Sequence, residues 1–128
     1  MTNEVMSIDS VLDLAEAMKN MDGDAELLQE IVEIFMDTAE SQLTSIQNGI
    51  RDGEIQQVAI QAHAMKGGSS NFCARKFVAS SLQLELLAKS ESLEGAEEML
   101  AQMRADYAEI VEVVGVINWE QVASSWEG

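Results

Sequence analysis

The chain of 128 residues contains no proline, one cysteine and few aromatic residues. Without proline, no position along the chain forces a helix to break. The single cysteine, Cys73, cannot form an intramolecular disulfide, so the fold must depend on its apolar core. The apolar runs are only a few residues long, far below the roughly 20 that cross a bilayer, and we expect no membrane-spanning segment.

Positive charge is also scarce. Seven Lys and Arg residues stand against 23 Asp and Glu residues, which gives a formal net charge of −16 and a pI near 4.1. Such a surface repels phosphate backbones and anionic lipid heads, so we expect neither nucleic acid nor a membrane surface as a partner. Residues 1–9 have neither the cationic nor the apolar part of a signal peptide. Together with the lone cysteine, this favours a cytoplasmic protein.

Apolar residues recur at spacings of three and four along the whole chain, which predicts an all-α protein. The length and the apolar content of 47% suit a single domain over residues 1–128. Four long helices with short connections favour an antiparallel up-down-up-down four-helix bundle. The long helices are expected over about 24–52, 54–70, 74–89 and 93–114.

Two short helices are expected beside the bundle. The first is capped by Asp9 or Ser10 and ends near residues 20–23. The second starts at Asn118 and places Trp119 and Trp126 on the same side, where we expect them to cover one end of the core. Contact of this last segment with a partner is the alternative.

Acidic residues are missing from one part of the chain. Residues 55–84 contain no Asp or Glu, although a uniform composition would place about five there. The same window holds the only histidine, His63, together with Lys66, Arg75 and Lys76. It therefore predicts a local positive site on a negative body, suited to a small anionic group and lacking the carboxylates that a cation would need.

His63 lies about 100° off the inner line of its predicted helix, so we expect its imidazole to reach solvent. Its helical neighbours are small, apolar or cationic. Gly67 would leave room for another protein surface, and Lys66 could offset the charge of a phosphoryl group on the histidine. The hydroxyls of Ser69 and Ser70 could donate to the phosphoryl oxygens.

Residues 62–74 read Ala-His-Ala-Met-Lys-Gly-Gly-Ser-Ser-Asn-Phe-Cys-Ala. This segment resembles the signature of histidine-containing phosphotransfer (HPt) domains, roughly A-H-x-L-K-G-S-S-x-x-L-G-A. The resemblance extends over about residues 8–114, which leaves 115–128 as a C-terminal extension. Two positions depart from the pattern, because Cys73 replaces a glycine and Gly68 replaces a serine or alanine.

The resemblance implies a four-helix bundle whose exposed histidine takes a phosphoryl group from an aspartyl phosphate on one receiver domain and passes it to another. His63 would be the phosphoacceptor, Lys66 would support the phosphoryl charge, and Gly67 would permit close approach of the receiver. The implied partners are response-regulator receiver domains and a hybrid sensor histidine kinase. Candidate docking residues around the histidine are Ala59, Ile60, Ser70, Arg75 and Lys76.

No nucleotide-binding signature is present, since Lys66-Gly67-Gly68-Ser69 lacks the order of a P-loop. We therefore expect a phosphocarrier without ATP-dependent kinase activity, not an enzyme. The acid-free window predicts no metal or cofactor of its own, so Mg²⁺ would come from the receiver. A carrier needs one exposed face, and we expect a monomer.

Two other functions remain open from the sequence. A non-phosphorylated acidic helical adaptor could sequester a partner through the same apolar patch. A small enzyme could use His63 with Cys73 as a nucleophile pair, although no orienting acid lies near them in the sequence.

Overall fold

The computed structural model describes residues 7–126, and within this range every regular element is an α-helix. The four long helices predicted from the sequence are confirmed, and their ends differ from the expected ones by at most three residues. The elements are α1 (Ile8–Val11), α2 (Leu14–Asn20), α3 (Ala25–Asp52), α4 (Ile55–Ser70), α5 (Arg75–Lys89), α6 (Ala96–Val114) and α7 (Trp119–Ser125).

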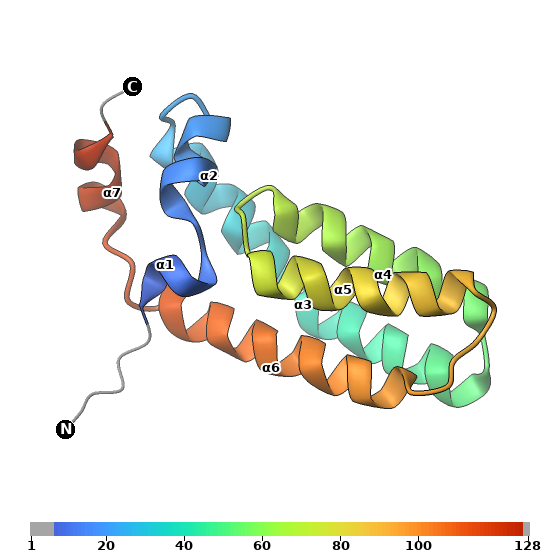
Figure 1. The fold of residues 1–128 in the computed structure, drawn as a ribbon. Coiled ribbons are helices and arrows are strands. Elements are labelled where there is room, and N and C mark those ends of the chain that lie inside the picture. Colours follow the sequence, from blue (N-terminus) through green and yellow to red (C-terminus); the bar gives the residue numbers. More distant parts are fainter. Residues whose placement is uncertain (1–6, 127–128) are drawn as a thin grey trace.

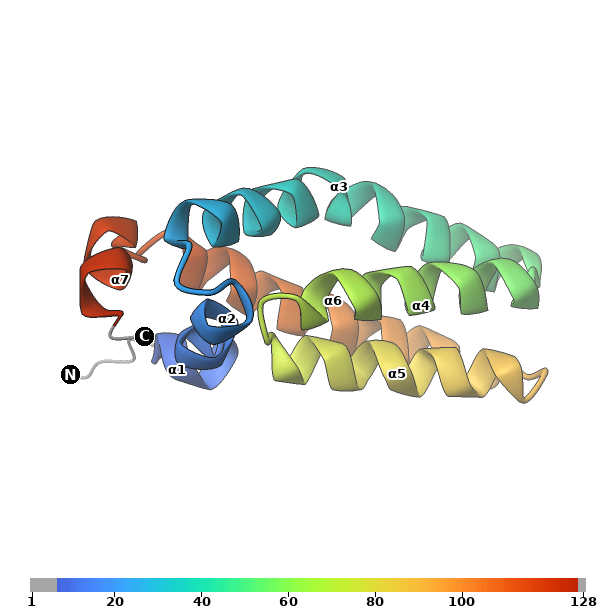
Figure 2. The same ribbon diagram turned by 90° about the horizontal axis from the view of Figure 1, so that it is seen from above.

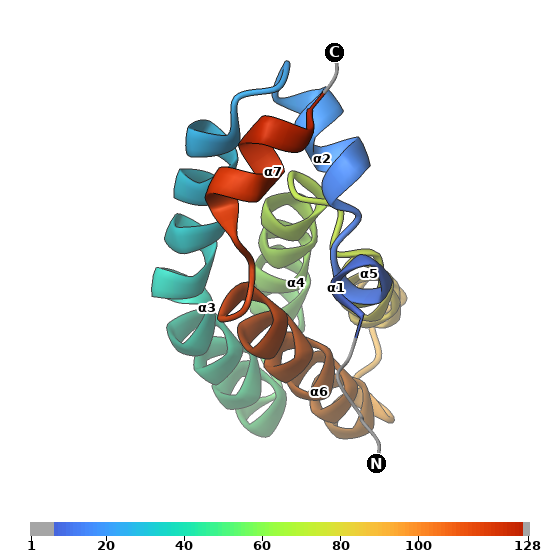
Figure 3. The ribbon, with the colours of Figure 1, turned by 90° about the vertical axis from the view of Figure 1, so that its left-hand side faces the viewer.

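Helices α3 to α6 form the predicted antiparallel bundle. Each runs back along its predecessor, so the α3–α4 and α5–α6 turns lie at one end and the α4–α5 turn lies nearer the other (Figures 1 and 2). Neighbours in sequence are neighbours in space, and α6 closes the ring against α3. The three short helices gather where α3 begins and α6 ends (Figure 3).

Capping residues set the bounds of α3. The carboxylate of Asp24 caps the helix by accepting the backbone N–H of Leu27 at 3.0 Å. Gly53 ends the helix with φ of +72°, a left-handed conformation that glycine adopts without strain. Between them, one line of buried apolar side chains faces the core. Its members are Leu28, Val32, Phe35, Ala39, Leu43 and Ile46.

Helix α4 continues through Gly67 and Gly68 to Ser70. Gly68 faces the side chain of Phe35, and a Cβ at this position would lie 3.3 Å from Phe35 Cδ1. The ring of Phe35 also packs edge-on against Phe72 and Phe77, with centroid distances of 5.1 and 5.6 Å. Gly68 therefore permits close packing of α3 on α4.

The prediction of one N-terminal helix is wrong, since the segment divides into α1 and α2 around Leu12 and Asp13. Leu12 is fully buried in extended backbone. Asp13 caps α2 by accepting the N–H of Glu16 at 3.1 Å, and its own N–H donates to the carbonyl of Cys73 at 3.2 Å. The cap that Asp13 provides and its hydrogen bond to the α4–α5 turn therefore stabilise the break more than a continuous helix would.

The C-terminal helix begins after Asn118, whose side chain accepts the N–H of Gln121 at 3.1 Å. Trp119 and Trp126 are half-buried against the core, which confirms that they cover one end. The indole of Trp126 lies directly against Gly23, leaving no space for a side chain there. No helix in the described part of the chain is long and apolar enough to cross a membrane.

Candidate functional site

His63 lies near the middle of α4 and reaches solvent, as predicted. Its side chain is 65% exposed, while Ala62 before it and Met65 after it are buried. The periodicity of α4 explains this arrangement, because the buried line runs along another face of the helix. The imidazole is thus accessible to a second protein.

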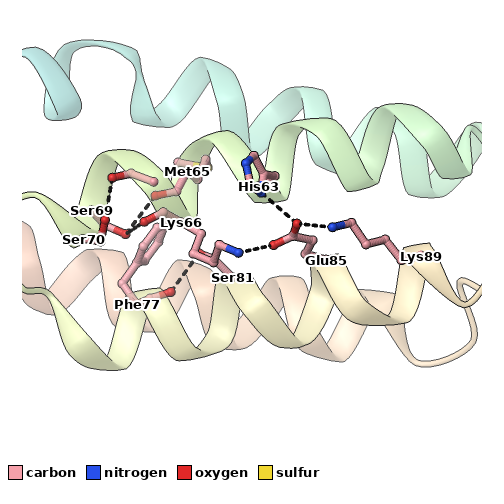
Figure 4. Close-up of polar contacts among 10 residues, drawn as sticks. His63, Met65, Lys66, Ser69, Ser70, Phe77, Ser81, Glu85 and Lys89 are labelled. Atoms are coloured by element: carbon pink, nitrogen blue, oxygen red, sulfur yellow. Dashed lines mark hydrogen bonds and ion pairs between the residues drawn. The ribbon is translucent and has the colours of Figure 1, made fainter.

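A buried carboxylate from α5 contacts this histidine. Glu85 is only 1% exposed, and its Oε2 lies 2.8 Å from Nδ1 of His63. Lys66 Nζ lies 2.7 Å from Oε1, and Lys89 Nζ lies 2.9 Å from Oε2. Figure 4 shows the two ammonium groups on either side of Glu85, with His63 on the facing helix. One buried carboxylate therefore binds three nitrogen groups.

The surroundings of Glu85 keep it ionised. Burial alone would raise the pKa of this carboxyl, but hydrogen bonds from Lys66, Lys89 and His63 outweigh that effect and lower its pKa to about 2. At neutral pH the group is a carboxylate, which only accepts hydrogen bonds.

This contact assigns the tautomer of His63. Because Glu85 Oε2 only accepts, Nδ1 of His63 carries the proton and donates it. In the neutral form of the ring, Nε2 then has the free lone pair. The contact with Glu85 thus occupies Nδ1 of a side chain that is otherwise largely exposed.

No acid lies near His63 in the sequence, but the fold places Glu85 beside it. Glu85 is the first acid after the acid-free window and lies 22 residues from His63 in the sequence, but the α4–α5 hairpin brings the two together. Neither Glu85 nor Lys89 is among the site residues that the sequence predicts. A signal is present, because a charge within the run Leu84-Glu85-Leu86-Leu87 on a buried helix face requires partners.

The glycine and apolar neighbours of His63 leave its surroundings open. A Cβ added at Gly67 would meet nothing within 4 Å. Ile60, one turn before the histidine, is 61% exposed, and Ala59 is half-buried. Another surface can therefore approach the ring without displacing side chains at these positions.

The two serines after Gly68 bond to their own helix. Ser69 is fully buried and donates to the carbonyl of Met65 at 2.8 Å, so the expected donation to a phosphoryl group is wrong for this residue. Ser70 is exposed and donates to the carbonyl of Gly67 at 2.8 Å.

The cations at the start of α5 have partners of their own. Arg75 contacts Asp13 Oδ2 at 2.8 Å, and Lys76 contacts Glu109 Oε1 at 2.8 Å. Neither of them binds Glu85, which distinguishes them from Lys66 and Lys89.

Cys73, which stands at the glycine position of the signature, has a positive φ. Its φ is +59°, in the left-handed region where a residue other than glycine is strained. Burial raises the pKa of its thiol. Seven helical steps, about 10 Å along the axis, separate His63 from the end of α4 that precedes this turn. The enzyme alternative with a Cys–His pair therefore finds no support in the geometry.

Comparison with known proteins decides the family. The family model described as Hpt domain matches residues 30–113, more than half of the chain. The chain belongs to the Hpt domain family. Hpt domains act by histidine phosphotransfer in phosphorelays, and His63 is the single histidine of this one.

A solved structure supports the fold of this Hpt domain. The chain is similar to histidine-containing phosphotransfer protein B (HptB) from Pseudomonas aeruginosa PAO1, with a TM-score of 0.72 and 24% identity. The similarity covers 94% of this chain and 100% of that one. No curated protein sequence matches the chain. Among residues 7–126, no three His, Cys, Asp or Glu side chains gather into a possible metal site.

Proposed function

We propose that this Hpt domain is a phosphocarrier that accepts a phosphoryl group on Nε2 of His63 from a receiver aspartyl phosphate and passes it to another receiver aspartate. The observation that carries the proposal is the bond from His63 Nδ1 to buried Glu85, which leaves Nε2 free on the exposed side of the ring. An adaptor without phosphotransfer would not need a histidine held in one tautomer.

The transfer step follows from this arrangement. The Nε2 lone pair forms the N–P bond while the O–P bond of the aspartyl phosphate breaks, and that electron pair stays on the aspartate. Nδ1 keeps its proton, so the ring gains a positive charge opposite the carboxylate of Glu85. In the onward step the N–P bond breaks and its electron pair returns to Nε2. Glu85 thus stabilises the ring charge in both directions.

Lys66 supports the negative charge of the phosphoryl group in this proposal. It lies one turn after His63 and contacts Glu85 Oε1. Phosphoryl transfer needs in-line positioning and neutralisation of the phosphoryl oxygens, commonly with Mg²⁺. The carboxylate beside His63 is already paired with two lysines, so we assign Mg²⁺, and the acids that hold it, to the receiver. The protein then needs no ATP-dependent kinase activity of its own.

The receiver surface would dock on the exposed side of α4 and α5. Gly67 and Ile60 provide an open, partly apolar surface around the histidine. Leu82 and Leu86, which are 37% and 56% exposed, extend it beside Glu85. Contributions from Ala59, Ser70, Arg75 and Lys76 belong to the same proposal, although the last two are engaged in ion pairs.

A response regulator and a hybrid sensor kinase are the proposed sources of these receivers. One docking face suffices for such a carrier, which agrees with a monomer. The cytoplasmic location expected from the sequence is part of the same proposal.

The test is phosphoryl transfer from pre-phosphorylated receiver domains to the full chain. We expect acid-labile, base-stable label on the wild type and none on His63→Gln. Each receiver is first shown to pass phosphate to another Hpt protein. If no active receiver in a complete panel labels the wild type, the carrier function is refuted. Partner binding and cellular function that survive His63→Gln would instead favour the adaptor.

A further inference from the structure

Lys89 and His63 contact the same oxygen atom of Glu85. Nζ of Lys89 lies 2.9 Å from Glu85 Oε2, the same atom that accepts from His63 Nδ1 at 2.8 Å. Lys66 binds the other oxygen, Oε1, at 2.7 Å. The carboxylate is therefore held at both oxygens by ammonium groups that lie on either side of it (Figure 4).

Helix stability alone does not explain this arrangement. A lysine one turn after a glutamate is common on helix surfaces and contributes little there. Here the acceptor is buried, and Lys66 already balances its formal charge. The second lysine brings one carboxylate and two ammonium groups to a formal charge of +1, next to the histidine.

We propose that Lys89 is a positioning residue for phosphoryl transfer, which holds Glu85 Oε2 in line with Nδ1 of His63 so that Nε2 stays the nucleophile. This inference rests on the function proposed above. Lys89 forms and breaks no covalent bond. In the transfer, Nε2 gains the phosphorus as the receiver's O–P bond breaks, and the electron pair leaves with the aspartate.

The physical reason lies in the freedom of a carboxylate. The last torsion of a glutamate is broad, so a group held at one oxygen can rotate around it. Without Lys89, the carboxylate of Glu85 would keep Lys66 and turn Oε2 away from His63 for part of the time. The imidazole then loses its fixed acceptor and samples the tautomer with the proton on Nε2, which has no lone pair for phosphorus.

The experiment measures tautomer and rate in the same variants of the full chain. Because His63 is the only histidine, its two ring nitrogens are assigned directly in long-range ¹H–¹⁵N spectra. Transfer is timed from a phosphorylated receiver that labels the wild type. Lys89→Met removes the ammonium group and Lys89→Arg restores a cation. Lys19→Met is the control, because Lys19 is also an exposed lysine in the last turn of a helix.

We expect Lys89→Met to raise the Nε2–H population and to slow transfer about tenfold, the effect of a weakened hydrogen bond to a charged group. Lys89→Arg should restore most of the wild-type tautomer population and most of the transfer rate. Lys19→Met should match the wild type in both measurements. The proposal is overturned if Lys89→Met matches Lys19→Met, even with reduced stability, or if only one of the two readouts changes. If no receiver labels the wild type, the carrier function is refuted. The tautomer measurement still tests Lys89 in that case, because an unchanged tautomer in Lys89→Met would show that Lys89 does not position the carboxylate of Glu85.

Discussion

Replacement of Glu85 by glutamine should destabilise the protein, and the loss should depend on pH. Glutamine keeps the shape of the side chain but removes the charge that Lys66, Lys89 and His63 contact. The pKa of Glu85 falls from 4.5, the ordinary value for a glutamate, to about 2 in the fold. A depressed carboxyl pKa stabilises the folded state above pH 4.5, and this contribution is lost as the pH falls toward 2.

The size of the effect follows from that difference. At neutral pH, a pKa lowered from 4.5 to about 2 corresponds to about 3 kcal/mol of folding free energy. The side chains of His63 and Lys89 are 65% and 59% exposed, so water screens part of their attraction. We therefore expect Glu85→Gln to lower the free energy of unfolding by about 2 kcal/mol at pH 7. By pH 3 the loss should fall to less than half of that value.

The measurement is urea unfolding of wild type and variant at pH 7, 5.5 and 3, values that avoid the pI near 4.1. Glu109→Gln is a matched control on α6, because it removes the same charge from a pair with a single exposed lysine, Lys76. We expect this control to cost no more than about 1 kcal/mol at pH 7. If Glu85→Gln is equally destabilising at pH 3 and pH 7, the buried ion cluster is not the source of the stability.

Three further substitutions test the α4 helix and the turn after it. Gly67→Ala should raise the free energy of unfolding by about 0.5–1 kcal/mol, because the helical position is open, yet slow transfer from a receiver; equal transfer rates would contradict the docking role. Gly68→Ala should stabilise the protein less than Gly67→Ala in urea unfolding, since its Cβ would lie 3.3 Å from Phe35. An equal increase in the free energy of unfolding would show that the ring of Phe35 moves aside without cost. Cys73→Gly should stabilise by about 0.5–1 kcal/mol by relieving the residue's φ of +59°, whereas a loss of stability would show that its side-chain packing outweighs the strain.

The long helices could be predicted from the sequence because their signals are local and repeated. In α3, one apolar line continues from Leu28 to Ile46 between Asp24 as a cap and Gly53 as a stop. The N-terminal segment could not be divided correctly by the same signals. Asp9, Ser10 and Asp13 are all good caps in isolation, and the choice depends on the bond from Asp13 N–H to the carbonyl of Cys73 in a distant turn.

The site shows the same division between local and distant information. The exposure of His63 follows from helix periodicity, which places Ala62 and Met65 inside. The contact with Glu85 depends on the register of α4 against α5, which no spacing within either helix specifies. The sequence predicts a role for Lys66 only toward a phosphoryl group, because its partner Glu85 lies on another helix.

The acid-free window also gains a physical account from Glu85. Two lysines hold one buried carboxylate, and the three groups together carry a formal charge of +1 beside His63. A second acid on the exposed side of α4 would reduce that charge to zero. It would also offer Lys66 and Lys89 a partner in water, where an ion pair has a smaller desolvation cost than at Glu85. Glu85 would then lose the contacts that keep it ionised, and His63 the acceptor that keeps Nε2 free. The absence of acids from α4 thus lets a single carboxylate hold both lysines beside the histidine.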